Sequence, residues 1–515
     1  MATEPISTPS EPAKSAVSTT AGLTPEERQS VVRTLRSPTL LKTEVLAGLV
    51  VALALIPEAL AFSVIAGVDP RIGLFSAFTM AVTISFLGGR PAMISAATGA
   101  VALVIAPLVA SYGVQYMIAA VLLAGVVQVL LAVSGVAKLM RFIPRQVMVG
   151  FVNALAILIL VAQVPELMGV PWLVYPLVLL GLLIVFGLPR LTTAVPASLV
   201  AIVVLTAVTV GASLTVPTVG DKGELPDSLP SLMLPDVPLT LDTLKVIFPY
   251  ALAVAFVGLL ESLMTAKLVD DVTDTRSNKT REAWGQGAAN IVTGFFGGMG
   301  GCAMIGQTMI NVKASGARTR ISTFLAGAFL LLLVVLFGDV VAVIPMAALV
   351  AVMIFVAVAS FDWHSIRPST LKMMPKSETA VMVATLAVTV TTHNLAIGVG
   401  IGVLVAMVLF ARRVAHFVTV ERTVTGHGED ATAVYTVNGE LFFASSNDLY
   451  FQFEYVRDPS HVVIDLSGSH VWDASTVAAL DAVTEKYRRH GTEVSITGLN
   501  DASVKMRNRM TGRLG

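Results

Sequence analysis

Two carboxylates stand inside long apolar runs of the sequence, where an ionised side chain is costly. One is Glu58, and the other is Glu261 in the segment Leu259-Leu-Glu-Ser-Leu-Met-Thr265. Ionisable residues within such segments usually mark the pathway of an ion or a proton. Glu261 and Thr265 are four residues apart and would share one face of a helix. A buried carboxyl can take up a proton and an ionised one can help to hold Na⁺, so Glu58, Glu261 and Thr265 are candidates for coupling to a cation. The alternative is a carboxyl that is hydrogen-bonded only for packing.

Two glycine-containing stretches in different halves of the chain resemble each other. The first is Gly88-Gly-Arg-Pro-Ala-Met-Ile-Ser-Ala-Ala-Thr-Gly99, and the second is Gly297-Gly-Met-Gly-Gly-Cys-Ala-Met-Ile-Gly-Gln-Thr308. Both contain Gly-Gly, then Ala-Met-Ile, and then a small or polar group before an apolar run. Two Gly-interrupted segments in corresponding halves of a membrane chain predict the binding site of a secondary transporter. The alternative is a chance similarity between two loops of a Gly- and Ala-rich chain.

The composition indicates that most of the chain lies in a membrane. Of the 515 residues, 55% are hydrophobic and 13% are charged, with a mean hydropathy of +0.80, whereas a soluble protein averages about 25% charged residues. The 34 basic and 34 acidic residues cancel, so the net charge tells nothing about partners, and we predict no nucleic-acid partner. Cys302 is the single cysteine, which excludes an internal disulfide and a cysteine-rich metal site. Because no nucleotide-binding or hydrolytic motif occurs, we predict neither an enzyme nor a cofactor, apart from a candidate bound Na⁺.

Apolar segments recur along most of the chain. We count about fourteen, and a segment needs about 20 residues to cross a bilayer. Loops after even-numbered segments carry most of the basic residues, such as Arg145, Arg281 and Arg320, as does the region before the first segment. The positive-inside rule therefore predicts that both termini are cytoplasmic. The approximate segments are 43–66, 71–87, 93–110, 115–135, 146–164, 172–188, 196–213, 243–268, 283–297, 303–315, 320–337, 340–359, 377–392 and 394–412.

Two sets of seven segments would start on opposite sides of the membrane, which is the arrangement of an inverted repeat. The two glycine motifs then open the third and the tenth segment. If each motif enters as extended chain and becomes helical near the midplane, two helix N-termini face each other there. Each N-terminus carries roughly half a positive charge and unpaired N–H groups, so the pair would attract an anion. The residues predicted to line this anion site are Ala96, Ala97, Thr98, Cys302, Ala303 and Met304.

The two ends of the chain differ in composition from the apolar region. Residues 1–39 are rich in Ser, Thr, Pro, Glu and Ala and lack the parts of a signal peptide, so we predict a disordered cytoplasmic tail. Residues 40–413 form the predicted transmembrane domain, and residues 414–432 a linker. Residues 433–515 alternate strand and helix patterns, which predicts a small cytoplasmic α/β domain.

Several short stretches carry a resemblance to a known family. In the apolar region they are Pro57-Glu-Ala-Leu-Ala-Phe62, Ile72-Gly-Leu-Phe-Ser76 and Pro144-Arg-Gln-Val-Met-Val-Gly-Phe151. In the C-terminal domain they are Gly439-Glu-Leu-Phe-Phe-Ala444, Val463-Ile-Asp-Leu-Ser467 and Val471-Trp-Asp-Ala-Ser-Thr476. Together they resemble a SulP-family anion transporter (sulfate permease family) that ends in a STAS domain (sulfate transporter and anti-sigma-factor antagonist). The resemblance covers nearly everything after residue 40.

The resemblance implies a membrane all-α fold with an inverted seven-plus-seven repeat, in which a core domain moves as an elevator against a gate domain. It also implies that the anion lies between the third and tenth half-helices and that the STAS domain assists a homodimer. In sodium-coupled bicarbonate members, an acid and a threonine on the eighth helix hold Na⁺, and Glu261 and Thr265 resemble this pair. Glutamate here replaces the aspartate, which leaves Na⁺ and H⁺ both open. Glu58 stands where the family often has glutamine and is a second candidate for proton coupling.

One residue of the STAS-like domain is a candidate for regulation. Ser475 matches the residue that is phosphorylated in anti-sigma-factor antagonists, although the glycine that usually follows it is absent. We therefore predict that Ser475 caps a helix, with phosphorylation as the alternative.

The sequence thus predicts secondary active transport of a small inorganic anion, of the sulfate or bicarbonate class, coupled to Na⁺ or H⁺. The protein would be a multi-pass component of the cell (inner or plasma) membrane and would contact the lipid bilayer. The alternatives are a passive anion channel, a dicarboxylate symporter of the same fold, and a signalling protein centred on its STAS domain. Acids within the membrane favour coupled transport over a channel, and the half-helix motifs would have no purpose in a signalling protein.

Overall fold

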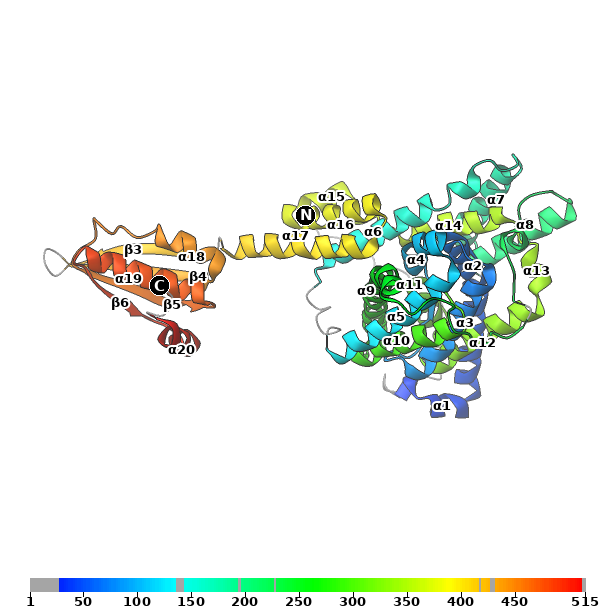
Figure 1. Cartoon of the computed structure of the whole chain (residues 1–515), viewed down its shortest axis with the longest axis horizontal. Helices are drawn as coiled ribbons and strands as arrows, with labels where there is room; N and C mark the ends of the chain where they lie inside the picture. Colours follow the sequence, from blue (N-terminus) through cyan, green and yellow to red (C-terminus); the bar gives the residue numbers. More distant parts are fainter. Residues whose placement is uncertain are drawn as a thin grey trace, which may run out of the picture. The chain divides into compact units, whose positions relative to one another are not determined.

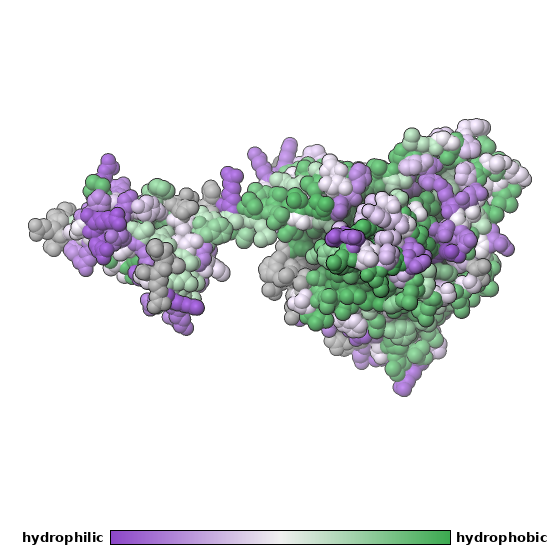
Figure 2. Space-filling view, viewed as in Figure 1, coloured by the Kyte–Doolittle hydropathy of each residue, from purple (hydrophilic) through white to green (hydrophobic). Residues whose placement is uncertain are grey.

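The computed structural model describes residues 27–135, 143–192, 196–226, 228–415, 418–426 and 431–511 (Figure 1). The chain divides into two compact units, with the boundary between Gly402 and Val403. The first unit holds the apolar helices up to the middle of the last one (Leu395–Ala415), and the second holds the rest of that helix and an α/β sheet. Figure 2 shows apolar residues over much of the visible face of the first unit, as expected of a surface that contacts lipid.

The first seven predicted segments each coincide with a helix or with a strand followed by a helix. The third segment is of the second kind, because its motif forms a short strand before the helix begins. In chain order these elements are α2 (Pro38–Ala66), α3 (Pro70–Leu87), β1 (Ser95–Ala96), α4 (Gly99–Tyr112), α5 (Val114–Val133), α6 (Arg145–Val161), η3 (Pro165–Leu167), α7 (Val174–Gly187), η4 (Leu188–Arg190) and α8 (Ala197–Gly211).

The second half of the first unit repeats this pattern after the short turn η5 (Val219–Lys222). The tenth segment is again a strand followed by a helix, and a π-helical turn continues that helix. The elements are α9 (Leu241–Thr273), α10 (Lys279–Phe295), β2 (Cys302–Ala303), α11 (Ile305–Met309), η6 (Ile310–Ala314), α12 (Arg320–Leu336), α13 (Gly338–Ala342), α14 (Met346–Ser360), α15 (Pro368–Met373), α16 (Lys376–Thr392) and α17 (Leu395–Ala415).

Several of these helices meet the length and hydropathy of a membrane span. Within the part of the chain that the structure describes, six do so: Pro38–Ala66, Pro70–Leu87, Val114–Val133, Arg145–Leu167, Leu241–Thr273 and Leu395–Val414. Five apolar helices are shorter: Gly99–Tyr112, Val174–Arg190, Ala197–Gly211, Arg320–Leu336 and Met346–Ser360. The helical membrane fold is confirmed, whereas the number of spans stays a prediction.

Helix packing in the first unit separates two groups of helices. One group contains α2, α3, α4, α5, α9, α10 and α12, and the other contains α6, α7, α8, α14 and α16. Small residues allow close packing, because a Cβ added at Gly48 of α2 would lie only 2.8 Å from Cβ of Leu325 in α12. The groups meet where α8 and α14 contact α2, and where α6 contacts α4. Each group takes helices from both halves of the chain, which agrees with the core and gate domains that the resemblance implies.

The start of the chain differs from the predicted disordered tail. Residues 1–26 lie outside the described residues, but most of residues 27–39 are helical rather than disordered. They form η1 (Glu27–Gln29), α1 (Val31–Arg36) and the first residues of α2. Ser30 stabilises α1 because its side chain accepts the backbone N–H of Arg33 at 3.4 Å.

The second unit is a four-stranded sheet with the strand order β3–β4–β5–β6. β3 is antiparallel to β4, and the other neighbours are parallel. Its core joins Tyr435 and Ile464 of the sheet to Leu480 of a helix, which confirms the predicted α/β domain. The elements are β3 (Thr419–Thr425), β4 (Thr432–Leu441), α18 (Phe443–Tyr450), β5 (His461–Val471), α19 (Ala474–Arg489), β6 (Glu493–Thr497) and α20 (Asp501–Met510).

Strand β3 lies within residues 414–432, which we predicted to be a linker, and that prediction is wrong for residues 419–425. β3 pairs with β4 along its whole length, and Arg422 forms an ion pair of 2.7 Å with the buried carboxylate of Asp458. β3 is an edge strand, and most of its side chains are exposed. Polar edge strands lack the apolar alternation that reveals a strand in a sequence.

Candidate anion-binding site

The two glycine motifs lie side by side in the structure. β1 and β2 form a two-stranded antiparallel sheet, in which Ser95 pairs with Ala303 and Ala96 pairs with Cys302. Gly301 makes this approach possible, because a Cβ at this position would lie 2.0 Å from the carbonyl oxygen of Ala96. Residues from two halves of the chain therefore meet backbone to backbone inside the first unit.

A helix begins directly after each of these strands. α4 starts at Gly99 with Thr98 as its N-cap, and the Thr98 hydroxyl oxygen accepts the backbone N–H of Val101 at 3.4 Å. α11 starts at Ile305 after Met304, which makes no side-chain cap, and η6 extends the helical run to Ala314. The first turn of any helix leaves N–H groups without intrahelical partners. The strand pairing thus brings the residues that lead into these two helices into contact, while the predicted anion site between the helix starts stays a prediction.

Glu261 in α9 contacts this region through Cys302. The Cys302 thiol donates a hydrogen bond of 2.9 Å to the Glu261 carboxylate, and its sulfur lies 3.2 Å from the Thr98 hydroxyl. The next residue of α9, Ser262, accepts the backbone N–H of Ala303 at 3.1 Å. All of these side chains are buried. Cys302 therefore links Glu261, the acid that we predicted to couple a cation, to the N-cap of α4. Cys302 itself lies in the strand that precedes α11.

The other two predicted coupling residues have different surroundings. The Thr265 hydroxyl donates to the backbone carbonyl of Glu261 at 2.8 Å rather than to its carboxylate, so only its oxygen lone pairs are left for a cation. Glu58 in α2 is buried, and its carboxyl bonds to the side chain of Gln307 in α11. Glu58 and Glu261 thus contact the tenth segment from two different helices.

The predicted anion-site residues do not all face the same space. The side chain of Ala303 packs against Met93 and Ala266 in a small separate cluster. Ala97 and Met304 belong instead to the large core, and a Cβ added at Gly99 would lie 2.9 Å from the Phe62 ring. Ala96, Ala97, Thr98, Cys302, Ala303 and Met304 are all buried. Ala303 therefore contributes its backbone to the strand, while its side chain contacts other parts of the core.

Uncharged polar side chains of α5 and α10, which we did not predict from the sequence, form hydrogen bonds around the two strands. The Asn290 side chain in α10 bonds to both the N–H (2.9 Å) and the carbonyl (3.1 Å) of Gly301, and donates to Gln128 in α5 at 2.9 Å. Gln286, one turn earlier in α10, donates to Ser95 of β1 at 2.7 Å. An amide inside an apolar helix is itself a signal, because buried polar groups need partners. Gln128 and Asn290 could have been marked on that ground.

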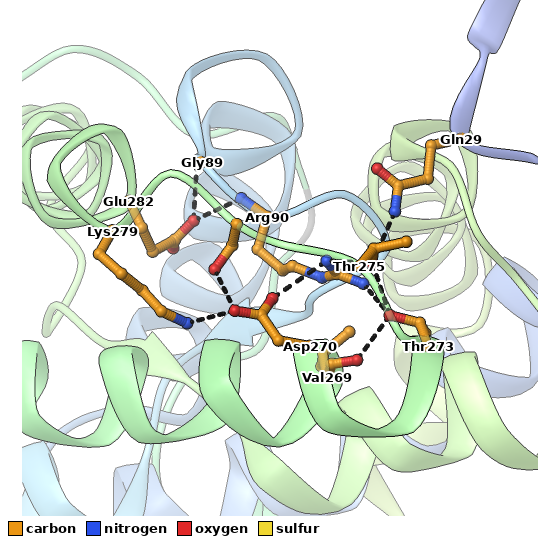
Figure 3. Close-up of polar contacts among 10 residues, drawn as sticks. Gln29, Gly89, Arg90, Val269, Asp270, Thr273, Thr275, Lys279 and Glu282 are labelled. Carbon is orange, nitrogen blue, oxygen red and sulfur yellow. Dashed lines mark hydrogen bonds and ion pairs between the residues drawn. The ribbon is translucent and has the colours of Figure 1, made fainter. Parts of the chain in front are cut away.

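A second polar cluster fixes the loop that leads into β1 (Figure 3). Arg90 is buried, and its guanidinium donates to Asp270 at 3.1 Å and to Thr275 at 2.7 Å. Lys279 approaches the same Asp270 carboxylate from another side at 2.8 Å. Glu282 accepts the backbone N–H groups of Gly89 and Arg90 at 2.7 and 3.0 Å. These contacts tie the first motif to the end of α9 and the start of α10.

Ser475 is not the helix cap that we predicted. α19 begins at Ala474, and the carboxylate of Asp473 accepts the backbone N–H of Thr476 at 3.1 Å. Asp473 has an extended backbone conformation and aspartate is as good an N-cap as serine, so the helix begins two residues earlier than predicted. Ser475 lies just inside the helix and is exposed.

Family models match both units. The model described as the sulfate permease family matches residues 41–176 and 171–385, and the STAS domain model matches residues 423–512. The chain belongs to the sulfate permease family. This family consists of membrane anion transporters rather than enzymes. Its members move anions such as sulfate or bicarbonate across a membrane.

Relatives of this sulfate permease family member are known in sequence and in structure. The protein named "Putative sulfate transporter YbaR" of Bacillus subtilis is 52% identical over 471 residues, which cover 91% of this chain and 97% of YbaR. The transmembrane domain of the cyanobacterial bicarbonate transporter BicA has a TM-score of 0.63 at 24% identity, covering 70% of this chain and 97% of that domain. The murine Slc26a9 anion transporter in the inward-facing state has a TM-score of 0.77 at 16% identity, covering 97% of this chain and 92% of that chain. Because the sequence identities are low, these two similarities show only that the chain shares the fold of BicA and Slc26a9.

Proposed function

We propose that this protein is a secondary active transporter of a small inorganic anion, of the sulfate or bicarbonate class, and that Na⁺ or H⁺ drives it. The anion would lie between the starts of α4 and α11. The pairing of β1 with β2 carries the proposal, because it brings two helix N-termini together inside an apolar unit. YbaR and BicA are named for sulfate and bicarbonate, which supports this class of substrate.

Two helix N-termini offer the positive partial charge and the hydrogen-bond donors that a small oxyanion needs. Each start contributes roughly half a positive charge and several unpaired N–H donors. Such a site needs no lysine or arginine, whose fixed charge would be costly within a membrane. Small residues such as Ala97 would let an anion approach the helix backbone closely, as glycines do at other anion-binding helix starts.

Charge balance supports coupling to a cation. An ionised Glu261, held next to the site by Cys302, would repel an anion. A proton on Glu261, or Na⁺ held by the Glu261 carboxylate and the lone pairs of Thr265, would remove that repulsion. Cation and anion would then bind with positive and reciprocal coupling, typically about 1–3 kcal/mol. Glu58 is the second candidate, because it contacts α11 through Gln307.

The division of the apolar helices into two packed groups supports a transport mechanism of alternating access. We propose that the group carrying β1 and β2 moves as an elevator against the other group, with the anion and the cation in the moving part. The protein would act in the cell membrane with both termini in the cytoplasm, and its STAS domain would assist a homodimer.

Reconstitution into proteoliposomes tests this function. Uptake of labelled sulfate, bicarbonate and a dicarboxylate is measured while the Na⁺ and pH gradients are varied independently. A coupled transporter accumulates its anion when one cation gradient is imposed and stops when that gradient is dissipated. Equilibration without accumulation under every gradient would indicate a passive channel, and the absence of any uptake would favour a signalling protein. Preferential uptake of the dicarboxylate would indicate a dicarboxylate symporter rather than a transporter of inorganic anions.

A further inference from the structure

The connection between α8 and α9 passes from one group of helices to the other. We call the group that carries β1 and β2 the core group, and the group of α6, α7, α8, α14 and α16 the gate group. The connection leaves the gate group at the end of α8 and enters the core group at the start of α9. It follows the seventh predicted segment, so the positive-inside rule places it on the outer face of the membrane.

The first part of this connection is fixed to the gate group. Thr218 forms an isolated antiparallel β-bridge with Pro345, which directly precedes α14. The turn η5 follows and is closed by Asp221, whose carboxylate accepts the N–H and the O–H of Thr218 at 2.7 and 2.9 Å. Lys222 at the end of η5 forms an ion pair of 2.7 Å with Glu166 in η3, which follows α6. A β-bridge and an ion pair thus hold a closed turn against the gate group.

Glu224, two residues further along, is fixed to the core group at the turn between α2 and α3. Its carbonyl accepts the backbone N–H of Arg71 at 3.1 Å, and its carboxylate forms an ion pair with the Arg71 guanidinium. The side chains of Glu224 and Arg71 are 70% and 45% exposed. An exposed ion pair contributes little to stability, so this contact can open and form again at a small energetic cost.

Gly223 is the residue between these two contacts. Its φ of +141° lies in a region that residues with a side chain rarely adopt. A Cβ at this position would overlap with the carboxylate of Asp69, the residue before α3. Glycine is therefore the residue that fits here, and it gives the backbone between Lys222 and Glu224 a large rotational freedom.

The short distance along the chain between the two contacts limits how far the groups can move. Two extended residues span at most about 7 Å, so both contacts cannot persist when the groups slide by more than this length allows. The gate side has a β-bridge, a closed turn and an ion pair, whereas the core side has one backbone hydrogen bond and one exposed ion pair. The core side is therefore the weaker contact and opens first.

We propose that residues 222–224 are a latch on the outer face, in which Arg71 and Glu224 hold the core group in the position that the structure shows, and Gly223 is the hinge. Movement of the core group releases Glu224 from Arg71 and rotates the backbone at Gly223, while Lys222 stays bound to Glu166. The latch rests on the elevator movement of the proposed function and deepens it, because it names one contact that this movement must break.

Two engineered disulfides, one on each side of the hinge, test the latch. Arg71→Cys with Glu224→Cys locks the core side, and Lys222→Cys with Glu166→Cys is the matched control on the gate side. Each full-length protein is reconstituted into proteoliposomes, and exchange of labelled sulfate is measured after oxidation and again after reduction. Binding of labelled sulfate to the purified protein is measured in the same two states.

Oxidation of Arg71→Cys with Glu224→Cys should lower sulfate exchange about tenfold or more, because the conformational step then limits turnover. Reduction should restore exchange, and sulfate binding should persist in both states, since the disulfide lies outside the candidate anion site. The oxidised control pair should exchange sulfate at the wild-type rate, because its contact stays closed throughout the movement.

Several results would overturn the latch while leaving transport itself in place. They are wild-type exchange by the oxidised core-side pair, loss of exchange in its reduced form, loss of its sulfate binding on oxidation, its failure to cross-link with an oxidant or a short bis-maleimide, and loss of exchange in the oxidised control pair. If the wild type exchanges no sulfate, the measurement is repeated with labelled bicarbonate. The absence of both activities would contradict the proposed function, and the latch would fail with it.

Discussion

At Gly301 the backbones of the two motifs lie in close contact, and replacing Gly301 with alanine perturbs the candidate site directly. The added Cβ would lie 2.0 Å from the carbonyl oxygen of Ala96 and 2.7 Å from its carbonyl carbon. Real Cβ atoms essentially never approach another heavy atom within 3.0 Å. The obstructing atoms belong to the backbone and cannot rotate away, so β1 and β2 must separate by more than an ångström.

Two costs follow from this separation. Overpacking a well-packed core typically costs about 1–3 kcal/mol of the free energy of unfolding. The helix starts also move apart, which should remove one hydrogen bond to the bound anion. A hydrogen bond to a charged group contributes about 1.5–3 kcal/mol, so the affinity for the anion should fall roughly tenfold to a hundredfold.

The assay measures thermal unfolding and anion affinity of purified Gly301→Ala beside Gly400→Ala. Gly400 lies in α17, where no heavy atom stands within 4 Å of an added Cβ, so this control should unfold no earlier than the wild type and bind normally. A monodisperse elution profile establishes that Gly301→Ala is folded. Wild-type anion affinity in folded Gly301→Ala would refute the idea that the close approach of β1 and β2 builds the site.

Three further changes test other parts of the account. Glu261→Gln should still bind and exchange the anion but should no longer accumulate it under a cation gradient. Glu261→Asp should keep part of the coupling. Full gradient-driven accumulation by Glu261→Gln would rule out Glu261 as the coupling residue and leave Glu58 as the candidate. Asp270→Asn leaves the buried Arg90 charge without its partner and should lower the free energy of unfolding by about 3–5 kcal/mol, whereas Asp271→Asn, at an exposed position, should have little effect in the same thermal denaturation. Removal of residues 416–515 takes away the whole STAS sheet including β3, and the remaining protein should bind its anion with unchanged affinity in an equilibrium assay; complete loss of binding by a folded truncation would contradict the location of the site in the first unit.

Much of the fold follows from local features of the sequence. Long apolar runs predict helices because a bilayer requires them, and the observed helices begin and end close to the predicted segments. The two motifs could be matched because glycines and the repeated Ala-Met-Ile mark the same interruption in both halves. Glu58 and Glu261 were visible because a carboxylate in an apolar run is rare.

The remaining features depend on contacts between distant parts of the chain. We predicted Cys302 to line the anion site, but its hydrogen bonds to Glu261 and Thr98 could not be predicted, because they join residues that are far apart in the chain. The direction of the Ala303 side chain depends on the pleat of a two-residue strand, which no periodicity reveals. The cap of α19 was misplaced because Asp473 and Ser475 are both good N-caps, and only the backbone conformation decides between them.

The most direct test of the central claim is to locate the bound anion. Crystals of the full-length protein would be soaked in an anomalously scattering analogue of the transported anion, which for sulfate is selenate. We expect an anomalous peak between the start of α4 at Gly99 and the start of α11 at Ile305, competed away by excess unlabelled anion. A competed peak elsewhere in the first unit, with no density between these two helix starts, would contradict the account.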